Sequence, residues 1–457
     1  MAGTRLTHDD FVRRLERNRL QRRDLLRLLG VATASPTLAA FSGCATSPVT
    51  GETILVGLSE EQERAIDRRQ SPHQFSQDLG PVQDSALGRY VASLGSDIDR
   101  HAHRQGMPYS YRVLNANYVN AYTFPAGSVG ITRGIMTEMQ NEAELAALIG
   151  HEVGHVNARH AAQRQGQAMV AQGAVVGLGV ALSNSQAGGL AQGLAMVAGQ
   201  LGASALLASY SRENEREADA LGQQYMTRAG YPASGMTQLH ETLLAKQRER
   251  PSLLATMFSS HPMAEERVAT ARRLAETTHR DTASRPVQRE RYMDSIAGLR
   301  ALKPTIAACQ RGEELQSRRE LPKAEEQFRD AVQRTPDDYA SNVLLARNLV
   351  AQRRHADAQR YASRARAIDP TEAQAVRVSA ISRLGQSEPS AAFADLDAFD
   401  RMLPGDPGIT FLKGVSLEAG GDRRGAADHY RRYLSVVQQG EGAQYAQTRL
   451  RAWSAAR

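Results

Sequence analysis

A period of 34 residues runs through the last third of the chain and restricts what that part can fold into. Two sets of small residues and one set of prolines return at this spacing, and three registers at one period rarely coincide by chance. Repeats of this length are usually units that cannot bury their apolar faces alone, so they stack into a solenoid. The recurring positions are Ala324, Ala358, Ala392 and Ala426; Gly312, Ala346, Ala380 and Gly414; and Pro336, Pro370 and Pro404.

Thirty-four residues is the length of a tetratricopeptide repeat, a pair of helices that cross closely at small side chains. Large residues such as Phe328 and Tyr430 then fill the space between repeats, and proline ends the second helix. Degenerate helical hairpins of another repeat class are the alternative, and they would build nearly the same solenoid. We predict an all-α tetratricopeptide domain over residues 291–457, with Cys309 in a helix and in the core.

The N-terminal 43 residues are typical of an export signal. Arginines precede an apolar run from Leu25 to Phe41, which is shorter than the ~20 residues that span a bilayer. Arg22-Arg23 resembles a twin-arginine motif, and Ser42-Gly43-Cys44 resembles a lipobox. A retained membrane anchor is the alternative. We predict cleavage before Cys44, a lipid tether and N-terminal helix over residues 44–85, and a periplasmic protein anchored to the outer membrane by lipid.

Composition argues against a polytopic membrane protein and against a nucleic-acid surface. Hydrophobic residues make up 41% and charged residues 23%, and much of the net charge of +7 lies in the leader. Residues 166–209 are almost free of charge, with apolar stretches Ala168–Leu182 and Leu190–Leu207. A hairpin of core helices packed through small residues is the favoured interpretation, and a hairpin that touches the bilayer is the alternative.

Residues 86–290 mix the two periodicities of secondary structure. Helical spacing begins at Leu87, Tyr111–Leu114 alternates like a strand, and Asn120–Thr132 reads as strand, turn and strand. Asn141 is a helix cap before a long apolar helix. The expected fold class is therefore an α+β, mostly helical domain with a small sheet, followed by the solenoid.

His151 and His155 flank Glu152 in an HExxH sequence inside that apolar helix. Four residues is about one helical turn, so the two histidines lie on the same face, about 6 Å apart along the helix axis. Both imidazoles can therefore reach one ion. This spacing suits Zn²⁺, which in catalytic sites takes three protein ligands and keeps one position for water. Glu152 is then the base for that water. An exposed helix that happens to carry these residues is the alternative.

A second helix opening at residues 213–219 offers the missing carboxylate. Glu215 and Asp219 are four apart and share a face, so one can bind zinc while the other accepts a hydrogen bond from a ligating histidine. Glu213 and Glu217 are also acidic and are the alternative candidates for this ligand. They lie on other faces of the helix or one turn earlier, and the simplest interpretation is that they belong to a solvated acidic surface.

These motifs together resemble the zincin-like HExxH zinc metalloprotease family of HtpX, the prenyl-protein endopeptidase and BepA. The resemblance covers roughly residues 45–275 and includes the ExxAD motif at 215–219, the segment at 120–127, and His261-Pro262 with Arg267. The repeats are similar to those of BepA-like periplasmic proteases, whereas the lipobox with Pro48–Gly51 is similar to LoiP-like lipoproteins.

The resemblance implies one zinc ion per chain, with His151, His155 and Glu215 as ligands and Glu152 as general base and later proton donor. Asp219 would orient a ligand. It also implies that His261 can take the open coordination position and close the enzyme, or stabilise the oxyanion as Arg267 could. The strand at Ser128–Ile131 is expected to pair with an extended substrate.

We therefore predict a zinc metalloendopeptidase of unfolded or misassembled envelope proteins, in outer-membrane protein quality control. Its partners would be unfolded polypeptides, the membrane through the lipid, and the outer-membrane assembly machinery through the repeats. A tetratricopeptide adaptor or chaperone with a latent protease domain is the alternative. A metal-dependent hydrolase of a non-peptide bond is more remote, because Ser128–Ile131 suits an extended peptide.

Overall fold

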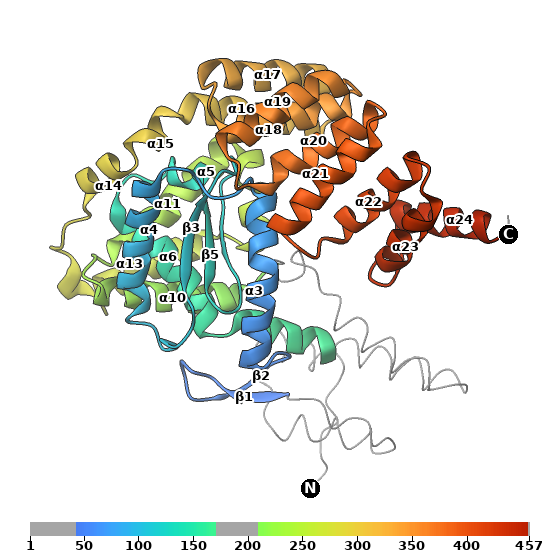
Figure 1. The fold of residues 1–457 in the computed structure, drawn as a ribbon. Coiled ribbons are helices and arrows are strands. Elements are labelled where there is room, and N and C mark those ends of the chain that lie inside the picture. The colour runs from blue at the N-terminus through green and yellow to red at the C-terminus, as the bar shows by residue number, and fades with distance from the viewer. Residues whose placement is uncertain (1–42, 171–208, 456–457) are drawn as a thin grey trace, which may run out of the picture.

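The computed structural model describes residues 43–170 and 209–455. The predicted export signal and most of the predicted hairpin at 166–209 lie outside these residues. Figure 1 shows a sheet wrapped by helices, with a curved array of helix pairs along one side. No helix within the described ranges has the length and apolar character that crossing a bilayer requires.

The chain first forms a small antiparallel hairpin of β1 (Cys44–Thr46) and β2 (Thr53–Leu55), followed by helix α3 (Glu60–Gln77). Ser59 caps α3 through a capping box with Gln62, which satisfies two amides at the helix start. The predicted helix from Ser59 into Arg69 is correct but too short. The helix runs on through Pro72 and ends at Gln77, with Asp78 as its C-cap.

Three strands form the central sheet: β3 (Ser110–Leu114), β4 (Ala121–Thr123) and β5 (Ser128–Thr132). Their order is β3-β5-β4, with β3 parallel and β4 antiparallel to β5. The expectation that Ser128–Ile131 pairs with substrate is wrong, because β5 is the central strand and both of its edges are already paired. The edge next to β5 is β4, which forms the other arm of the predicted hairpin.

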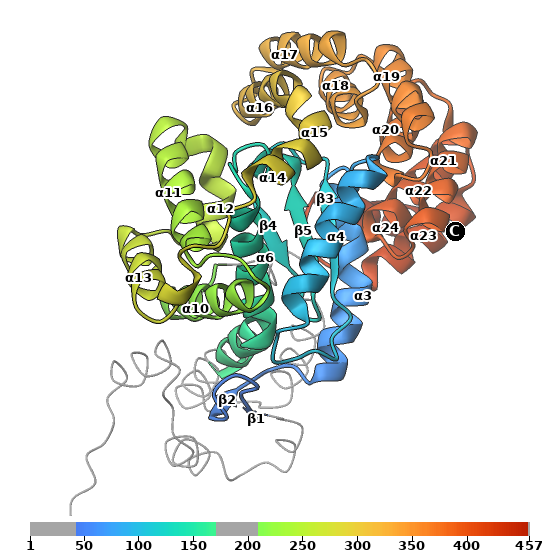
Figure 2. The same cartoon turned by 90° about the vertical axis from the view of Figure 1, so that its left-hand side faces the viewer.

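Helices cover the sheet and enclose the core (Figure 2). The predicted apolar helix is α6 (Glu142–Asn157), in which every residue is buried and Asn141 accepts the amide of Glu144. This burial explains why apolar residues occur on all sides of α6. A further helical stretch begins at His160. Other helices of this part are α4 (Ser85–Asp99), α5 (Arg133–Met136), α10 (Arg212–Arg228), α11 (Ser234–Glu249), η2 (Pro251–Leu254), α12 (Ala255–Ser260), α13 (Glu265–Glu276), η3 (Arg280–Thr282), α14 (Arg289–Ser295) and α15 (Ala297–Ala301).

The C-terminal third is a solenoid of antiparallel helix pairs, as the period predicts. The recurring alanines are fully buried, and a side chain at Gly312 or Gly414 would collide with the ring of Phe328 or Tyr430. The predicted fold class is confirmed. Its helices are α16 (Lys303–Ser317), α17 (Leu321–Arg334), α18 (Tyr339–Ala351), α19 (His355–Ile368), α20 (Ala373–Gly385), α21 (Pro389–Met402), α22 (Pro407–Ala419), α23 (Arg423–Leu434) and α24 (Glu441–Ala455).

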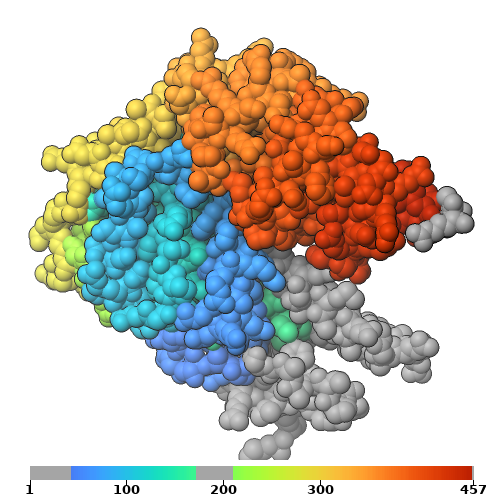
Figure 3. Space-filling view, in the orientation of Figure 1, coloured from blue at the N-terminus to red at the C-terminus, as the bar shows by residue number. Residues whose placement is uncertain are grey.

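The solenoid lies directly against the N-terminal helices and the sheet (Figure 3). One of its contacts is a buried ion pair, in which Arg133 Nη1 donates to Asp338 Oδ1 at 2.6 Å. Residues 133 and 338 belong to α5 and to the N-cap of α18. The two parts of the molecule therefore share a polar, desolvated interface.

Candidate metal centre

Helix α6 places the two histidines of the HExxH sequence on one face. His151 Nε2 and His155 Nε2 lie 3.0 Å apart, and both side chains are buried. Burial lowers the pKa of His155 well below its usual value, which favours the neutral imidazole that a metal needs. The residues that make α6 helical thus also make its two nitrogens converge.

A seam of small residues brings α10 against α6. A Cβ on Gly154 would lie 2.8 Å from the carbonyl oxygen of Ala218, and one on Gly222 would lie 2.6 Å from the amide of His151. Because no side chain separates the backbones, Glu215 reaches the histidines. Its Oε1 lies 3.3 Å from His155 Nε2.

His261 ends α12 and completes the cluster from a third direction. Its Nδ1 lies 3.3 Å from His151 Nε2 and 3.1 Å from Glu215 Oε1. The structure therefore brings together the four predicted ligands, and their donor atoms all lie within 4.8 Å of one another.

The spacing of these four groups fits a tetrahedral ion. Ligand atoms at 2.0–2.1 Å from Zn²⁺ stand about 3.3–3.4 Å apart along a tetrahedral edge. The observed separations around His151 are 3.0 Å to His155, 3.3 Å to His261 and 3.6 Å to Glu215. Burial opposes the charge of Glu215, but His261 and His151 outweigh it and hold the pKa of this carboxyl well below its usual range. The donor set, three histidine nitrogens and a carboxylate oxygen, can hold a metal ion and fits the N and O ligands that zinc takes.

Asp219 supports the first ligand. Its Oδ1 lies 2.9 Å from His151 Nδ1, so it can accept the proton on the nitrogen that faces away from the metal position. Arg267 donates to both oxygens of Asp219 at 2.7 Å, and His240 Nε2 lies 3.3 Å from it. Burial disfavours the charge on Asp219, yet Arg267 and His240 keep its pKa well below the usual range.

Arg267 also makes an ion pair of 2.7 Å with Glu215 Oε2, and it donates to the carbonyl of Pro262. Its guanidinium is therefore directed at the two carboxylates and at the loop that carries His261. In this structure Arg267 contacts the residues that hold the metal position.

Glu152 lies beside the cluster and is 1% exposed. Its Oε1 is 3.9 Å from His261 Nε2, and its Oε2 has no hydrogen-bond partner among residues 43–170 and 209–455. Burial raises the pKa of Glu152, although His261 and His151 oppose that effect. A buried carboxylate with a free oxygen and a raised pKa suits a group that takes up a proton.

Comparison with known proteins agrees with this geometry. Residues 85–275 match the model of Peptidase family M48. We call these residues the M48 domain, after the family whose model they match. The predicted resemblance to a metalloprotease family is confirmed for this domain, and the names of the relatives agree with the metalloendopeptidase class.

Three relatives carry protease names, all from Escherichia coli (strain K12). The β-barrel assembly-enhancing protease is 31% identical over 203 residues, 42% of this chain and 40% of that protein. Metalloprotease YcaL is 28% identical over 256 residues, 52% of this chain and 93% of YcaL. Metalloprotease LoiP is 31% identical over 179 residues, 38% of this chain and 64% of LoiP. The chain spans less than half the length of the first of these relatives.

In the M48 domain, His155 also has hydrogen-bonding partners that the sequence did not predict. His155 Nδ1 lies 2.8 Å from His160 Nδ1, and His160 Nε2 lies 3.2 Å from Glu217 Oε2. Glu217 was interpreted as a solvated acidic residue, but it partners a fully buried histidine. The signal was the His160 five residues beyond the second ligand.

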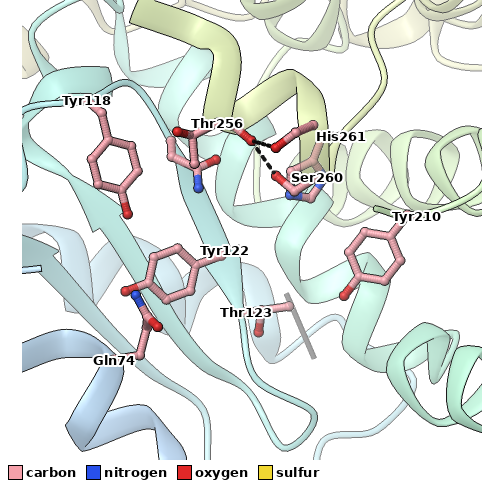
Figure 4. Close-up of a pocket in the computed structure, with 10 residues that line it drawn as sticks. Gln74, Tyr118, Tyr122, Thr123, Tyr210, Thr256, Ser260 and His261 are labelled. Carbon is pink, nitrogen blue, oxygen red and sulfur yellow. Dashed lines mark hydrogen bonds between the residues drawn. The ribbon is translucent and has the colours of Figure 1, made fainter. Parts of the chain in front are cut away.

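Tyr210 is a second missed neighbour of the metal centre in the M48 domain. Its ring stacks on His155 with centroids 3.9 Å apart, and Arg164 lies over it at 4.7 Å. Figure 4 shows Tyr210 and His261 at one side of a pocket beside the cluster, facing Tyr118 and Tyr122 from the sheet side. Sequence pattern gave no sign of this contact, because residue 210 lies before the helix that carries Glu215.

Proposed function

We propose that this protein is a zinc metalloendopeptidase that hydrolyses peptide bonds of unfolded or misassembled proteins of the bacterial envelope. The observation that carries the proposal is the buried cluster of His151, His155 and Glu215 with Glu152 beside it. The M48 match and the protease names of the relatives support the reaction class. Outer-membrane protein quality control is the role that fits the relative named for β-barrel assembly.

A zinc ion held by His151, His155 and Glu215 would supply Lewis acidity for a carbonyl and for water. Glu152 accepts a proton from the attacking water and later delivers a proton to the leaving amine. Cleavage of one peptide bond therefore consumes one water molecule. Asp219 keeps His151 in the tautomer whose Nε2 is free, and the His160–Glu217 pair acts in the same way on His155. These second partners orient the ligands and do not touch substrate.

Substrate would bind in extended form along β4. Within the described part of the chain, β4 pairs on one side with β5 and with no other strand. Its free edge therefore offers N–H and C=O groups to a peptide backbone, which any unfolded chain can use. Because recognition through the backbone ignores sequence, this mode suits a protease of misfolded clients.

Digestion of casein and of an unfolded outer-membrane β-barrel protein tests the proposal directly. Wild type should cleave both, whereas Glu152→Gln and chelator-treated wild type should not. If the wild-type protein leaves both substrates intact while the full chain still binds them, the adaptor alternative is correct and the protease proposal fails.

The lipid anchor is part of the same proposal. Cys44 is exposed at the start of β1, where an attached lipid would not disturb the core. A diacylglycerol with an amide-linked chain provides the two-chain attachment that stable anchoring needs. Cys44→Ser should leave the outer-membrane fraction, and a variant that still sediments with membranes after a carbonate wash would disprove lipidation as the anchor.

A further inference from the structure

A cavity of about 130 Å³ opens beside His261, between β4 and α12. Figure 4 shows Tyr118 and Tyr122 on one side of it, and Ser260, His261 and Tyr210 on the other. Because His261 belongs to the metal cluster, a substrate backbone in this cavity would lie beside the metal position. The wall opposite the cluster is therefore placed to contact the bond that is cleaved.

The hydrogen bonds of β4 determine which of its backbone groups point to its unpaired edge. Thr132 N–H donates to the carbonyl of Asn120 at 3.0 Å, and Phe124 N–H also donates to a carbonyl of β5, at 2.9 Å. Backbone groups point to alternate sides along a strand, so those of Ala121 and Thr123 point away from β5. A substrate strand on the edge of β4 would pair with these two residues and pass the side chain of Asn120.

Asn120 lies directly before this edge and has an unsatisfied acceptor. It lines the cavity and is 5% exposed. Its Oδ1 has no hydrogen-bond partner in the part of the chain that the structure describes. A buried carbonyl oxygen without a partner is costly unless a ligand or water supplies a donor. This oxygen is therefore available to a bound group.

Tyr118 and Asp78 fix the orientation of the Asn120 amide. Tyr118 Oη donates its proton to Asp78 Oδ1 at 2.9 Å. A hydroxyl has one proton, so the phenol oxygen can only accept from Asn120, and the group that bonds to it is the amide nitrogen. The relay from Asp78 through Tyr118 to Asn120 thus leaves Oδ1 as the end that can accept from substrate.

We propose that Asn120 is a catalytic residue whose Oδ1 accepts the N–H of the scissile amide, an inference that rests on the proposed protease function. The N–H and C=O of a trans amide point in opposite directions. A substrate whose carbonyl oxygen faces the metal cluster therefore directs the N–H of the same amide to the opposite wall, where Asn120 bonds to Tyr118. An N–H is the donor that this unpaired oxygen needs.

This hydrogen bond is expected to strengthen as the peptide bond breaks. Glu152 delivers its proton to the amide nitrogen, the C–N bond cleaves, and the electron pair of that bond remains on the nitrogen. The nitrogen gains positive character in this step, which makes its N–H a stronger donor. An acceptor that is already in place stabilises this transition state more than it stabilises the bound substrate. Loss of Asn120 should therefore affect kcat more than KM.

Replacement of single N–H groups by ester oxygens tests the contact without cleavage. An unstructured fluorescent casein peptide and its depsipeptide variants are bound to zinc-loaded Glu152→Gln and to Glu152→Gln/Asn120→Ala, and affinities are measured by fluorescence polarisation. At one position the ester should weaken binding to Glu152→Gln by about tenfold, the upper end for a single hydrogen bond. The same ester should have no effect once Asn120 is replaced. If every ester effect persists in Asn120→Ala, the contact is disproved.

Tyr118→Phe and Tyr122→Phe form a matched pair that also serves where Asn120→Ala does not fold. Both phenols donate to Asp78, but Asn120 bonds to Tyr118 whereas Gln74 bonds to Tyr122. Tyr118→Phe should therefore reduce the ester effect several-fold, and Tyr122→Phe should retain it. Equal ester effects in the two variants would contradict the orientation of Asn120 by Tyr118.

Cleavage by wild type separates this inference from the proposed function. The N–H that couples to Asn120 should belong to the bond that wild type cleaves in the same peptide. Asn120→Ala should lower kcat for that bond by about 100-fold at unchanged zinc content. Coupling to the N–H of an uncleaved bond would overturn the catalytic role and leave the protease. Coupling in a protein that cleaves nothing would retain the contact and remove the protease.

Discussion

The metal centre and the loop before β4, residues 115–120, are held in place in opposite ways. Every residue of the metal centre comes from the M48 domain, and its members contact one another, as Asp219 does His151 and Arg267. Residues 115–120 depend on the solenoid: Asn117 accepts from Arg133, which pairs with Asp338. The metal centre is built from one domain, whereas the loop before β4 is held jointly by that domain and the solenoid.

Two further contacts extend this joint construction. Gln310 of α16 donates to the carbonyl of Asn117 at 2.7 Å, one residue before Tyr118. Gln374 of α20 donates to Ser76 at 3.1 Å, two residues before Asp78. The solenoid thus touches both segments whose side chains meet under the cavity. These contacts connect the repeats to the cavity wall without involving a residue of the metal cluster.

The largest expected effect breaks the metal centre alone. Glu215→Ala should lose the zinc ion, because two histidines and a displaceable third leave it under-coordinated. Cleavage should fall by more than about 100-fold, since partners of ligands already cost about 10–100-fold. Elemental analysis and casein digestion measure both, with Glu217→Ala as the milder control. Full zinc content in Glu215→Ala would assign the carboxylate ligand elsewhere.

The second prediction breaks the interface alone. Asp338→Ala leaves the guanidinium of Arg133 buried without its countercharge, which should destabilise the protein by about 3–5 kcal/mol. Zinc content should stay at the wild-type level while cleavage weakens. Asp337→Ala is the control, because its neighbouring carboxylate is 89% exposed and pairs with Arg364 at 3.6 Å. Loss of zinc from folded Asp338→Ala would show that the two regions are not independent.

Sequence reasoning succeeded in this molecule where the relevant contacts are local or periodic. His151 and His155 converge because they are four apart in one helix, and the 34-residue period specifies helix pairs whatever surrounds them. It failed on the edge strand, because strand order is set by pairing between segments and not by their patterns. The interface between the solenoid and the M48 domain could not be predicted for the same reason, because Arg133 and Asp338 are 205 residues apart in the sequence.

The third prediction concerns His261, which is a member of the metal cluster and also lines the cavity beside it. As a fourth ligand it would exclude the water that Glu152 needs. His261→Ala should therefore raise basal cleavage several-fold at unchanged zinc content. If His261 instead stabilises charge in the transition state, kcat of His261→Ala should fall at intact metal content. That result would refute the prediction that His261 restrains activity by occupying the open coordination position.

The smallest expected effect is a pH dependence of the interface. Glu313 of α16 accepts a hydrogen bond from Asn117 at 3.2 Å, and burial raises the pKa of Glu313 from 4.5 to about 7. A carboxyl with a raised pKa in the folded protein adds stability below its unfolded pKa, and this stability is lost as the pH rises through about 7. Zinc-loaded wild type should therefore lose stability relative to Glu313→Gln between pH 5 and 8, by at most about 2–3 kcal/mol at ~1.4 kcal/mol per pKa unit, measured as a falling Tm. Glu314→Gln, on the same helix and more exposed, should follow wild type. Identical pH profiles for Glu313→Gln and wild type would mean that Glu313 stays ionised against Asn117, and the interface would then be insensitive to pH through this residue.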